Sequence, residues 1–423
     1  MKNTQTNTTS AKGGVDEQEN YFAPPPPSKG RIYAIDQHPD VNVVAIVKGS
    51  TPHDMRTEKI KGDLTLEQLV AWLGEVAQPH DMILVEAGNG CFELSRRLGD
   101  VGLSCCVLES SWVGAQADKY VDNDKLAAVR IARVYLQGNA KAVWQPDQST
   151  IEKRQLLHLH IKAKQARTKA INSLGCFLTN YGIRPGSKTL SNARNQIWIR
   201  NSKTWTARES FTLEDLIDDV NYTTQRSRNI ERRIAAEITL DKKMLSLMSL
   251  LGIGMINAFA LMATIGDIHR FKTPKKLVAY MGLNPNQKTS GKGKNKTTGA
   301  GNRGRKDIRT LLTQGAQAVL RQGSRTLLGK WGMSLMLRKG HRNIAVAAIA
   351  RKMAMQVWHL LMGNKAEWLE PTKSRSTKFT KMLSTLGKAA RETLRLPATS
   401  KECINHFNLI LEPINPDIMI KSS

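Results

Sequence analysis

The strongest constraint on the fold is a helical periodicity that extends over residues 151 to about 245. Apolar residues there recur at steps of three and four, the spacing of one face of an α-helix. The first run consists of Leu156, Leu159, Ala163, Ala166, Ala170 and Leu174. After a polar stretch around Pro185, a second long helix is predicted from Thr212, with Asp215 in the capping-box position. Two long amphipathic helices predict an antiparallel coiled-coil arm, with an ordinary helical bundle as the alternative.

Residues 29 to about 150 have a different pattern and predict an α/β domain. Short apolar runs typical of strands occupy residues 32–35, 41–47, 82–85 and 103–108. The first two flank the Pro39-Asp40 turn and are expected to pair as a hairpin. Helices are predicted over residues 64–73, 92–98 and 123–136, the last capped by Asn123 or Asp122. Residues 1–28 form a leader whose four closing prolines mark a domain boundary.

Residues 246–365 predict a second, helical domain. Gly252 and Gly254 lie between two helical runs, which indicates a helix-hairpin-helix whose backbone N–H groups could meet a phosphate. Further helices are predicted over residues 308–321 and 344–362. Residues 366–423 are a basic tail to which the sequence assigns no role.

The charge balance points to a polyanionic partner. The chain has 63 Lys and Arg against 36 Asp and Glu, a net charge of +27, and nucleic acid is the ordinary partner of such a surface. The segment from Phe271 to Lys306 holds ten Lys or Arg and no Asp or Glu. The residues predicted to bind nucleic acid are Lys288, Lys292, Lys294, Lys296, Arg303, Arg305 and Lys306, with Gly252 and Gly254. The hydroxyl of Ser290, inside this segment, could donate to a phosphate or attack it.

Cysteine usage and hydropathy exclude several classes of protein. The cysteines form no CxxC and have no metal-ligand spacing, which argues against a zinc ribbon or a disulfide scaffold. They are Cys91, Cys105, Cys106, Cys176 and Cys403. No run of about 18 apolar residues suggests a membrane span, and the polar N-terminus does not read as a signal peptide. A cytoplasmic protein is expected.

Three acidic residues stand where elements begin or end. Asp36 ends the first predicted strand, Glu86 ends a later one, and Asp124 opens a helix. Because the carboxyl ends of parallel strands meet at one sheet edge, these side chains are expected to converge. Converging carboxylates repel one another unless a divalent cation neutralises them, which favours Mg²⁺ or Mn²⁺. Taken singly, each residue also fits a turn former or a helix-start charge.

Together these segments resemble the transposases of the bridge-RNA-guided insertion sequences, the "DEDD" serine recombinases related to the pilin-gene invertases. The resemblance covers about residues 30–365 and rests on five ordered motifs. The motifs are Tyr33-Ala34-Ile35-Asp36, Val85-Glu86-Ala87-Gly88, residues 123–133, Gly252-Ile253-Gly254 with residues 265–271, and residues 279–285 with Ser290-Gly291.

The resemblance implies two catalytic domains. The first would be a ribonuclease-H-like (RuvC-like) domain that holds Mg²⁺ through Asp36, Glu86 and Asp124. The second would be a helical transposase domain in which Ser290 attacks the scissile phosphate and forms a phosphoserine–DNA intermediate. It further implies a homotetramer assembled with help from the helical arm, a guide RNA that pairs with donor and target DNA, and a bacterial, nucleoid-associated location.

One position departs from the family pattern, which has a second Asp three residues after Asp124. Here that residue is Ala127. Ala127 is interpreted as an introduced inactivating substitution, because the surrounding motif is otherwise intact. Two alternatives are that the chain is a natural inactive homologue, or that Asp122 or Asp118 takes the place of the missing acid. Two other functions compete with the recombinase. One is a metal-dependent DNA nuclease without a covalent intermediate, and the other is a domesticated homologue that binds nucleic acid but does not cut.

Overall fold

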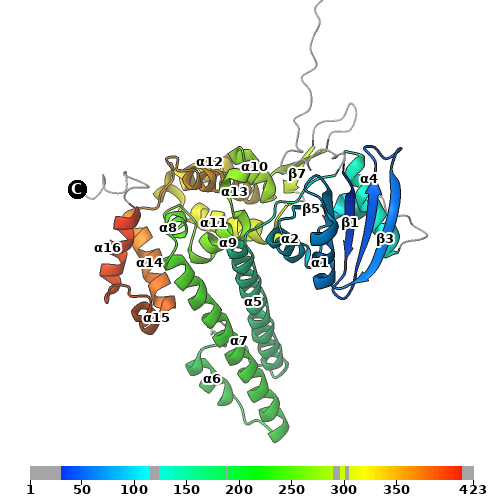
Figure 1. Ribbon diagram of the computed structural model, residues 1–423. Coiled ribbons are helices and arrows are strands. Elements are labelled where there is room, and N and C mark those ends of the chain that lie inside the picture. Colours follow the sequence, from blue (N-terminus) through cyan, green and yellow to red (C-terminus); the bar gives the residue numbers. More distant parts are fainter. Residues whose placement is uncertain are drawn as a thin grey trace, which may run out of the picture. The chain divides into compact units, whose positions relative to one another are not determined.

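The structure is a computed structural model that describes residues 30–114, 123–138, 140–186, 189–288, 296–300 and 304–411. The chain divides into two compact units, Met1–Pro146 and Asp147–Ser423. The first contains a five-stranded sheet with helices, and the second is mostly helical (Figure 1). The predicted fold class is confirmed at the level of a mixed α/β fold that is mostly helical and contains one five-stranded sheet.

The sheet of the first unit has a parallel centre. Its strands are β1 (Ile32–Gln37), β2 (Asn42–Lys48), β3 (Arg56–Leu64), β4 (Met82–Glu86) and β5 (Cys105–Leu108), in the order β3-β2-β1-β4-β5. β1 is antiparallel to β2, which confirms the predicted hairpin, and β2 is antiparallel to β3. β4 runs parallel to both β1 and β5. The carboxyl ends of β1, β4 and β5 therefore lie at one edge.

Helices cover both faces of this sheet. They are α1 (Leu66–Val76), α2 (Cys91–Asp100), α3 (Ser110–Gly114) and α4 (Asp124–Leu136). Along β1, Tyr33 and Ile35 pack in one core with α1 and α2, whereas Ile32 and Ala34 pack in the other core with α4. This alternation follows from the two-residue period of a strand.

Sequence reasoning missed β3 entirely. Its residues are mostly polar and exposed, and it pairs with β2 alone, as an edge strand does. The predicted helix over residues 64–73 was also misplaced at its start, because Leu64 still belongs to β3. α1 begins at Leu66, after a capping box formed by Thr65 and Gln68.

Two antiparallel helices of 33 residues each, α5 (Gln148–Asn180) and α7 (Ala207–Thr239), form a long hairpin in the second unit (Figure 1). The end of α5 packs on the start of α7 through Leu174 and Leu213, and the start of α5 packs near Ile234. The predicted start at Thr212 is wrong. α7 begins five residues earlier, because Thr206 and Glu209 form its capping box. A short helix, α6 (Ala193–Arg200), lies between them in sequence.

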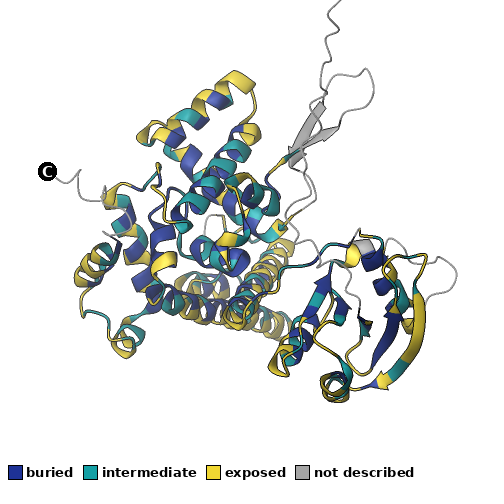
Figure 2. Cartoon of the chain, turned by 45° about the horizontal axis from the view of Figure 1, so that its top comes forward, coloured by how far each residue is buried: buried dark blue, intermediate teal, exposed yellow. Residues whose placement is uncertain are grey.

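The rest of the second unit shares one core with the base of this hairpin. Its elements are α8 (Lys242–Met248), α9 (Met255–Ile265), η1 (Ile268–Arg270), α10 (Pro274–Tyr280), β6 (Pro285–Lys288), β7 (Lys296–Ala300), α11 (Lys306–Gln322), η2 (Gly323–Arg325), α12 (Leu327–Lys339) and α13 (Arg342–Leu361). Buried residues line the inner faces of these helices and exposed residues lie outside (Figure 2). Among the described residues, α13 alone is long and apolar enough to cross a membrane, and half of its apolar window is buried in the fold, as in a core helix.

The segment after residue 366 is part of the same core. It forms α14 (Thr372–Leu386), α15 (Lys388–Thr393) and α16 (Ser400–Leu411). Phe379, Leu383 and Phe407 are buried in the main cluster of the second unit. Residues 366–411, which the sequence described only as a basic tail, are therefore a structural part of this unit.

Candidate functional site

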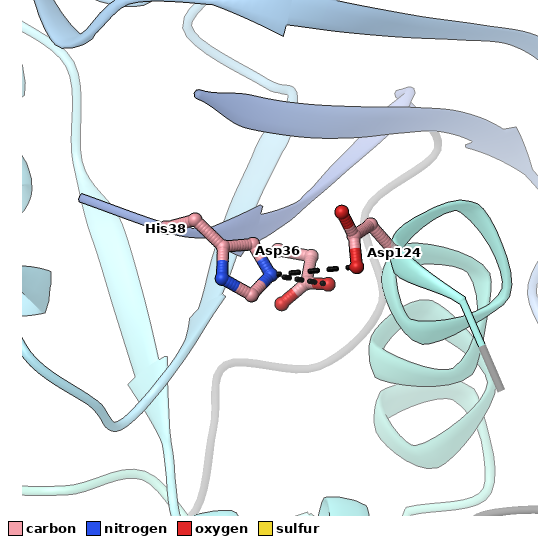
Figure 3. A group of neighbouring side chains, drawn as sticks. All are labelled: Asp36, His38 and Asp124. Atoms are coloured by element: carbon pink, nitrogen blue, oxygen red, sulfur yellow. Dashed lines mark ion pairs between the residues drawn. The ribbon is translucent and has the colours of Figure 1, made fainter. Parts of the chain in front are cut away.

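The structure brings Asp36, at the end of β1, close to Asp124, the first residue of α4 (Figure 3). His38, two residues beyond Asp36, lies beside both carboxylates and faces them. Its Nε2 atom is 3.5 Å from Oδ2 of Asp36 and 3.6 Å from Oδ1 of Asp124. One ligand atom from each side chain lies within 4.8 Å of the others, close enough for the three to share a metal ion.

Local structure holds Asp124 in place. Asn123 caps α4 by accepting a hydrogen bond from the Leu126 N–H at 3.0 Å, which selects Asn123 over Asp122 as the cap. Ala128 and Ile131 anchor the helix in the core beneath the sheet. Asp124 thus stands in the first turn, where the partial positive charge of the helix N-terminus stabilises a carboxylate.

Glu86 ends β4, the strand next to β1. Ile35 and Val85 are register partners in the parallel pair, so Asp36 and Glu86 follow at matching positions along the two strands. Among the described residues, the group with metal-ligand spacing contains Asp36, His38 and Asp124, without Glu86. The backbone thus aligns Glu86 with the site, while His38 contributes the third nearby ligand atom.

The environment of Asp36 disfavours a bare carboxylate. Partial burial raises the pKa of Asp36, the nearby Asp124 carboxylate adds to this, and His38 and Arg130 act in the opposite direction. A cation at the site would relieve the repulsion between the two carboxylates. Two carboxylates and an imidazole are a donor set that fits a divalent metal ion.

Sequence reasoning missed His38. The available signal was the Asp36-x-His38 spacing at a strand end, because side chains two residues apart in an extended chain point to the same side. The contact with Asp124 had no local signal.

Ala127 lies in the first turn of α4, three residues after Asp124, and is half-buried. Residues three apart share a helix face, so a carboxylate at position 127 would stand near Asp124. Asp118 and Asp122, the alternative acids, lie outside the described residues.

Several of the predicted residues of the basic segment lie outside the described residues. The residues concerned are Ser290, Lys292, Lys294 and Arg303. Lys288 and Lys296 are register partners at the ends of the antiparallel strands β6 and β7. Lys306 is exposed at the start of α11. The predicted roles of these residues stay predictions.

Arg305 takes part in a cluster of arginines that the sequence did not indicate. It pairs with Asp307, at 2.7 Å between Nη2 and Oδ2. Burial acts to raise the pKa of Tyr280, but the nearby Arg270, Arg154 and Arg305 guanidinium groups outweigh it and hold the pKa below its ordinary value. Arg270 also lies 4.4 Å from the centre of the Tyr280 ring. Arg154 and Arg270 also donate to the backbone carbonyl oxygens of Ala263 and Ile265 in α9.

The two glycines of the predicted hairpin have different surroundings. Gly252 has a φ of +72°, and a Cβ there would lie 2.8 Å from the carbonyl oxygen of Gly315 in α11. Gly254 precedes α9 in an extended conformation and has open space beside it. Gly252 is thus required by packing, and phosphate binding at this turn stays a prediction.

The fold and site define a protein with a carboxylate-bearing α/β unit and a basic helical unit. Residues 244–328, which span the Ser290 segment, match the family described as "Transposase IS116/IS110/IS902 family".

Curated relatives agree with this match. The chain is 25% identical over 291 residues to a "Probable family 20 transposase" of Pseudomonas aeruginosa, covering 67% of this chain and 84% of the relative. It is 30% identical over 239 residues to the "Transposase for insertion sequence element IS1111A" of Coxiella burnetii, covering 56% of this chain and 63% of the relative. It is 24% identical over 336 residues to the "Transposase for insertion sequence element IS1328" of Yersinia enterocolitica, covering 76% of this chain and 96% of the relative. The chain is therefore similar to insertion-sequence transposases, and its residues 244–328 match the IS116/IS110/IS902 family.

Proposed function

We propose that this chain is an RNA-guided DNA transposase that uses Ser290 as its nucleophile and an acidic site at Asp36, Glu86 and Asp124. The observation that carries the proposal is the convergence of Asp36 and Asp124 in the first unit. The second unit matches the transposase family over the segment that contains Ser290. A mixed sheet with a parallel centre and its acids at the strand ends supports the ribonuclease-H-like assignment.

In the proposed reaction, the Ser290 hydroxyl oxygen loses its proton to solvent and attacks a DNA phosphorus, the bond from phosphorus to one deoxyribose oxygen breaks, and that oxygen takes up a proton. The phosphoserine conserves the energy of the phosphodiester, so a different strand end can reverse the step and complete strand exchange. Asp36, Glu86 and Asp124 would hold Mg²⁺ or Mn²⁺, which would supply charge stabilisation at the phosphate. Arg270 and Arg305 would attract the backbone towards the second unit.

The partners follow from the same proposal. The net charge of +27 fits a protein that binds the backbones of a guide RNA and of donor and target DNA. The α5–α7 hairpin would support a homotetramer. We place the protein in the bacterial cytoplasm, on nucleoid DNA.

A binding-only homologue is the second candidate, and Ala127 is the observation that favours it. A site that lacks one family carboxylate could bind RNA and DNA without cutting.

The test is a denaturing gel of labelled DNA incubated with the Ala127→Asp variant, divalent metal and co-purified RNA. We expect a covalent protein–DNA adduct that Ser290→Ala removes and Thr289→Ala, the adjacent hydroxyl, retains. Cleavage without an adduct would favour the nuclease, and binding with neither would favour the binding-only homologue. Absence of a discrete co-purifying RNA would contradict guidance.

A further inference from the structure

The imidazole of His38 faces two carboxylates that belong to different elements. Asp36 and His38 come from the end of β1 and the residue after it, and Asp124 comes from the start of α4 (Figure 3). This arrangement lies at the acidic site but uses a residue outside the family pattern of carboxylates.

The two separations are those of loose ion pairs rather than close hydrogen bonds, and they leave room for a shared ion. Nε2 of His38 lies 3.5 Å and 3.6 Å from the two carboxylate oxygens. These values exceed the usual length of about 2.7–3.2 Å for a hydrogen bond from nitrogen to oxygen. Donor atoms that each lie about 2.1 Å from one metal ion are themselves about 3–3.5 Å apart in octahedral or tetrahedral geometry. Nε2 of His38 thus already stands near the separation from each carboxylate oxygen that a common ion requires, and the three ligand atoms lie within 4.8 Å of one another.

Access and chemistry agree with this role. The side chains of His38 and Asp124 are 47% and 55% exposed, so an ion could enter from solvent and keep positions for water or phosphate. Mg²⁺ prefers oxygen ligands and retains its waters, whereas an imidazole nitrogen increases affinity for first-row transition ions. Since position 127 offers no carboxylate, the nitrogen of His38 is the third ligand atom at hand.

We propose that His38 is a metal ligand together with Asp36 and Asp124, and that it gives the site a preference for transition divalent ions such as Mn²⁺ over Mg²⁺. This inference rests on the acidic site of the proposed function and adds to it a ligand and a metal selectivity.

The test measures metal binding by the full chain, with no DNA present. Mn²⁺ binding is followed by electron paramagnetic resonance, and Mg²⁺ is titrated as a competitor. We expect His38→Gln to weaken Mn²⁺ binding by about tenfold or more, with a smaller effect on Mg²⁺, because the lost ligand is nitrogen. Spin-echo modulation from a coordinated ¹⁴N nucleus should be present in the parent chain and lost in His38→Gln.

His80→Gln is the matched control, because His80 also lies beside a carboxylate, at 3.9 Å from Oδ1 of Asp81, and is exposed. Unchanged or tighter Mn²⁺ binding in His38→Gln would overturn the proposal, since the imidazole would then act only as a positive charge that competes with the ion. The Asp36→Asn variant tests the acidic site of the proposed function separately from the role of His38. If Asp36→Asn leaves Mn²⁺ binding intact, the acidic site itself is wrong, whereas loss in Asp36→Asn without loss in His38→Gln overturns only the role of His38.

Discussion

Lys378 in α14 and Glu370, just before that helix, form an ion pair of 2.8 Å between Nζ and Oε1 inside the second unit. The same ammonium donates to the carbonyl oxygens of Met248, Leu250 and Ile253. Burial lowers the pKa of Lys378, and Glu370 opposes that effect. The C-terminal segment thus satisfies the backbone of the turn between α8 and α9.

The first prediction concerns this pair. Lys378→Met leaves Glu370 buried without its partner and removes one donor from each of the Met248, Leu250 and Ile253 carbonyl groups. Loss of one partner of a buried pair costs about 3–5 kcal/mol in the free energy of unfolding. Chemical denaturation measures the free energy of unfolding of Lys378→Met. The control is Lys381→Met, on the exposed side of the same helix, which should change stability by about 0.5 kcal/mol or less. Equal stability of the two variants would contradict the coupling between α14 and the turn.

The second prediction separates the two glycines. Gly252→Ala must adopt a left-handed conformation and also displace α11 at Gly315, so we expect a loss of more than about 2 kcal/mol. Gly254→Ala meets open space and should cost under about 1 kcal/mol. Thermal unfolding of both variants measures the two losses of stability. A loss in Gly252→Ala no larger than that in Gly254→Ala would contradict the packing of Gly252 against Gly315.

The third prediction is a pH dependence that arises from His160 in α5. Burial lowers the pKa of His160, Glu231 acts to raise it, and Lys164 acts to lower it. Below the ordinary pKa of about 6.5, the unfolded chain takes up a proton that the folded protein disfavours. The free energy of unfolding therefore falls with pH from that value down to the lowered pKa of the folded state.

His160→Leu removes this group, so the variant should lose less stability than the parent chain between pH 7.5 and pH 5. Urea denaturation at both pH values measures the difference. An identical loss in the parent and the variant would show that His160 titrates normally.

The fourth prediction concerns Ala127. Ala127→Asp adds a carboxylate to the first turn of α4, next to Asp124, where the helix N-terminus tolerates a negative charge. We expect tighter divalent-metal binding and a gain of metal-dependent strand exchange, with little change in melting temperature. Leu126→Asp adds the same charge in the same turn at an exposed position and should restore no activity. A revertant that binds RNA and DNA but stays inactive would favour the binding-only homologue.

Features with a local origin could be predicted from the sequence. The β1–β2 hairpin follows from two apolar runs on either side of a short turn. A cap at Asn123 or Asp122 follows from polar side chains before an apolar helix, and the structure has Asn123 as the cap. The two helices of the arm follow from periodicity, and the start of α7 differs from the predicted one because Thr206 and Glu209 form a capping box before Thr212.

The positions of Asp36 and Asp124 were predictable in kind, because a strand end and a helix start are local features. The proximity of His38 to Asp36 has a local signal in their spacing, whereas the proximity of His38 to Asp124 depends on how α4 packs against the sheet. The arginines around Tyr280 come from α5, η1 and the residue before α11, and no local pattern relates them.

The sequence by itself determined the division into an α/β part and a helical part, the basic character, and the family resemblance, because periodicity, charge and motif order are properties of neighbouring residues. Only the tertiary structure decided that polar β3 completes the sheet and that residues 366–411 join the core of the second unit. Both depend on pairing with distant segments. The edge strand gains its order from hydrogen bonds to β2, and the C-terminal helices gain theirs from burial of Phe379 and Phe407 and from the Lys378 contacts, which no short stretch of sequence encodes.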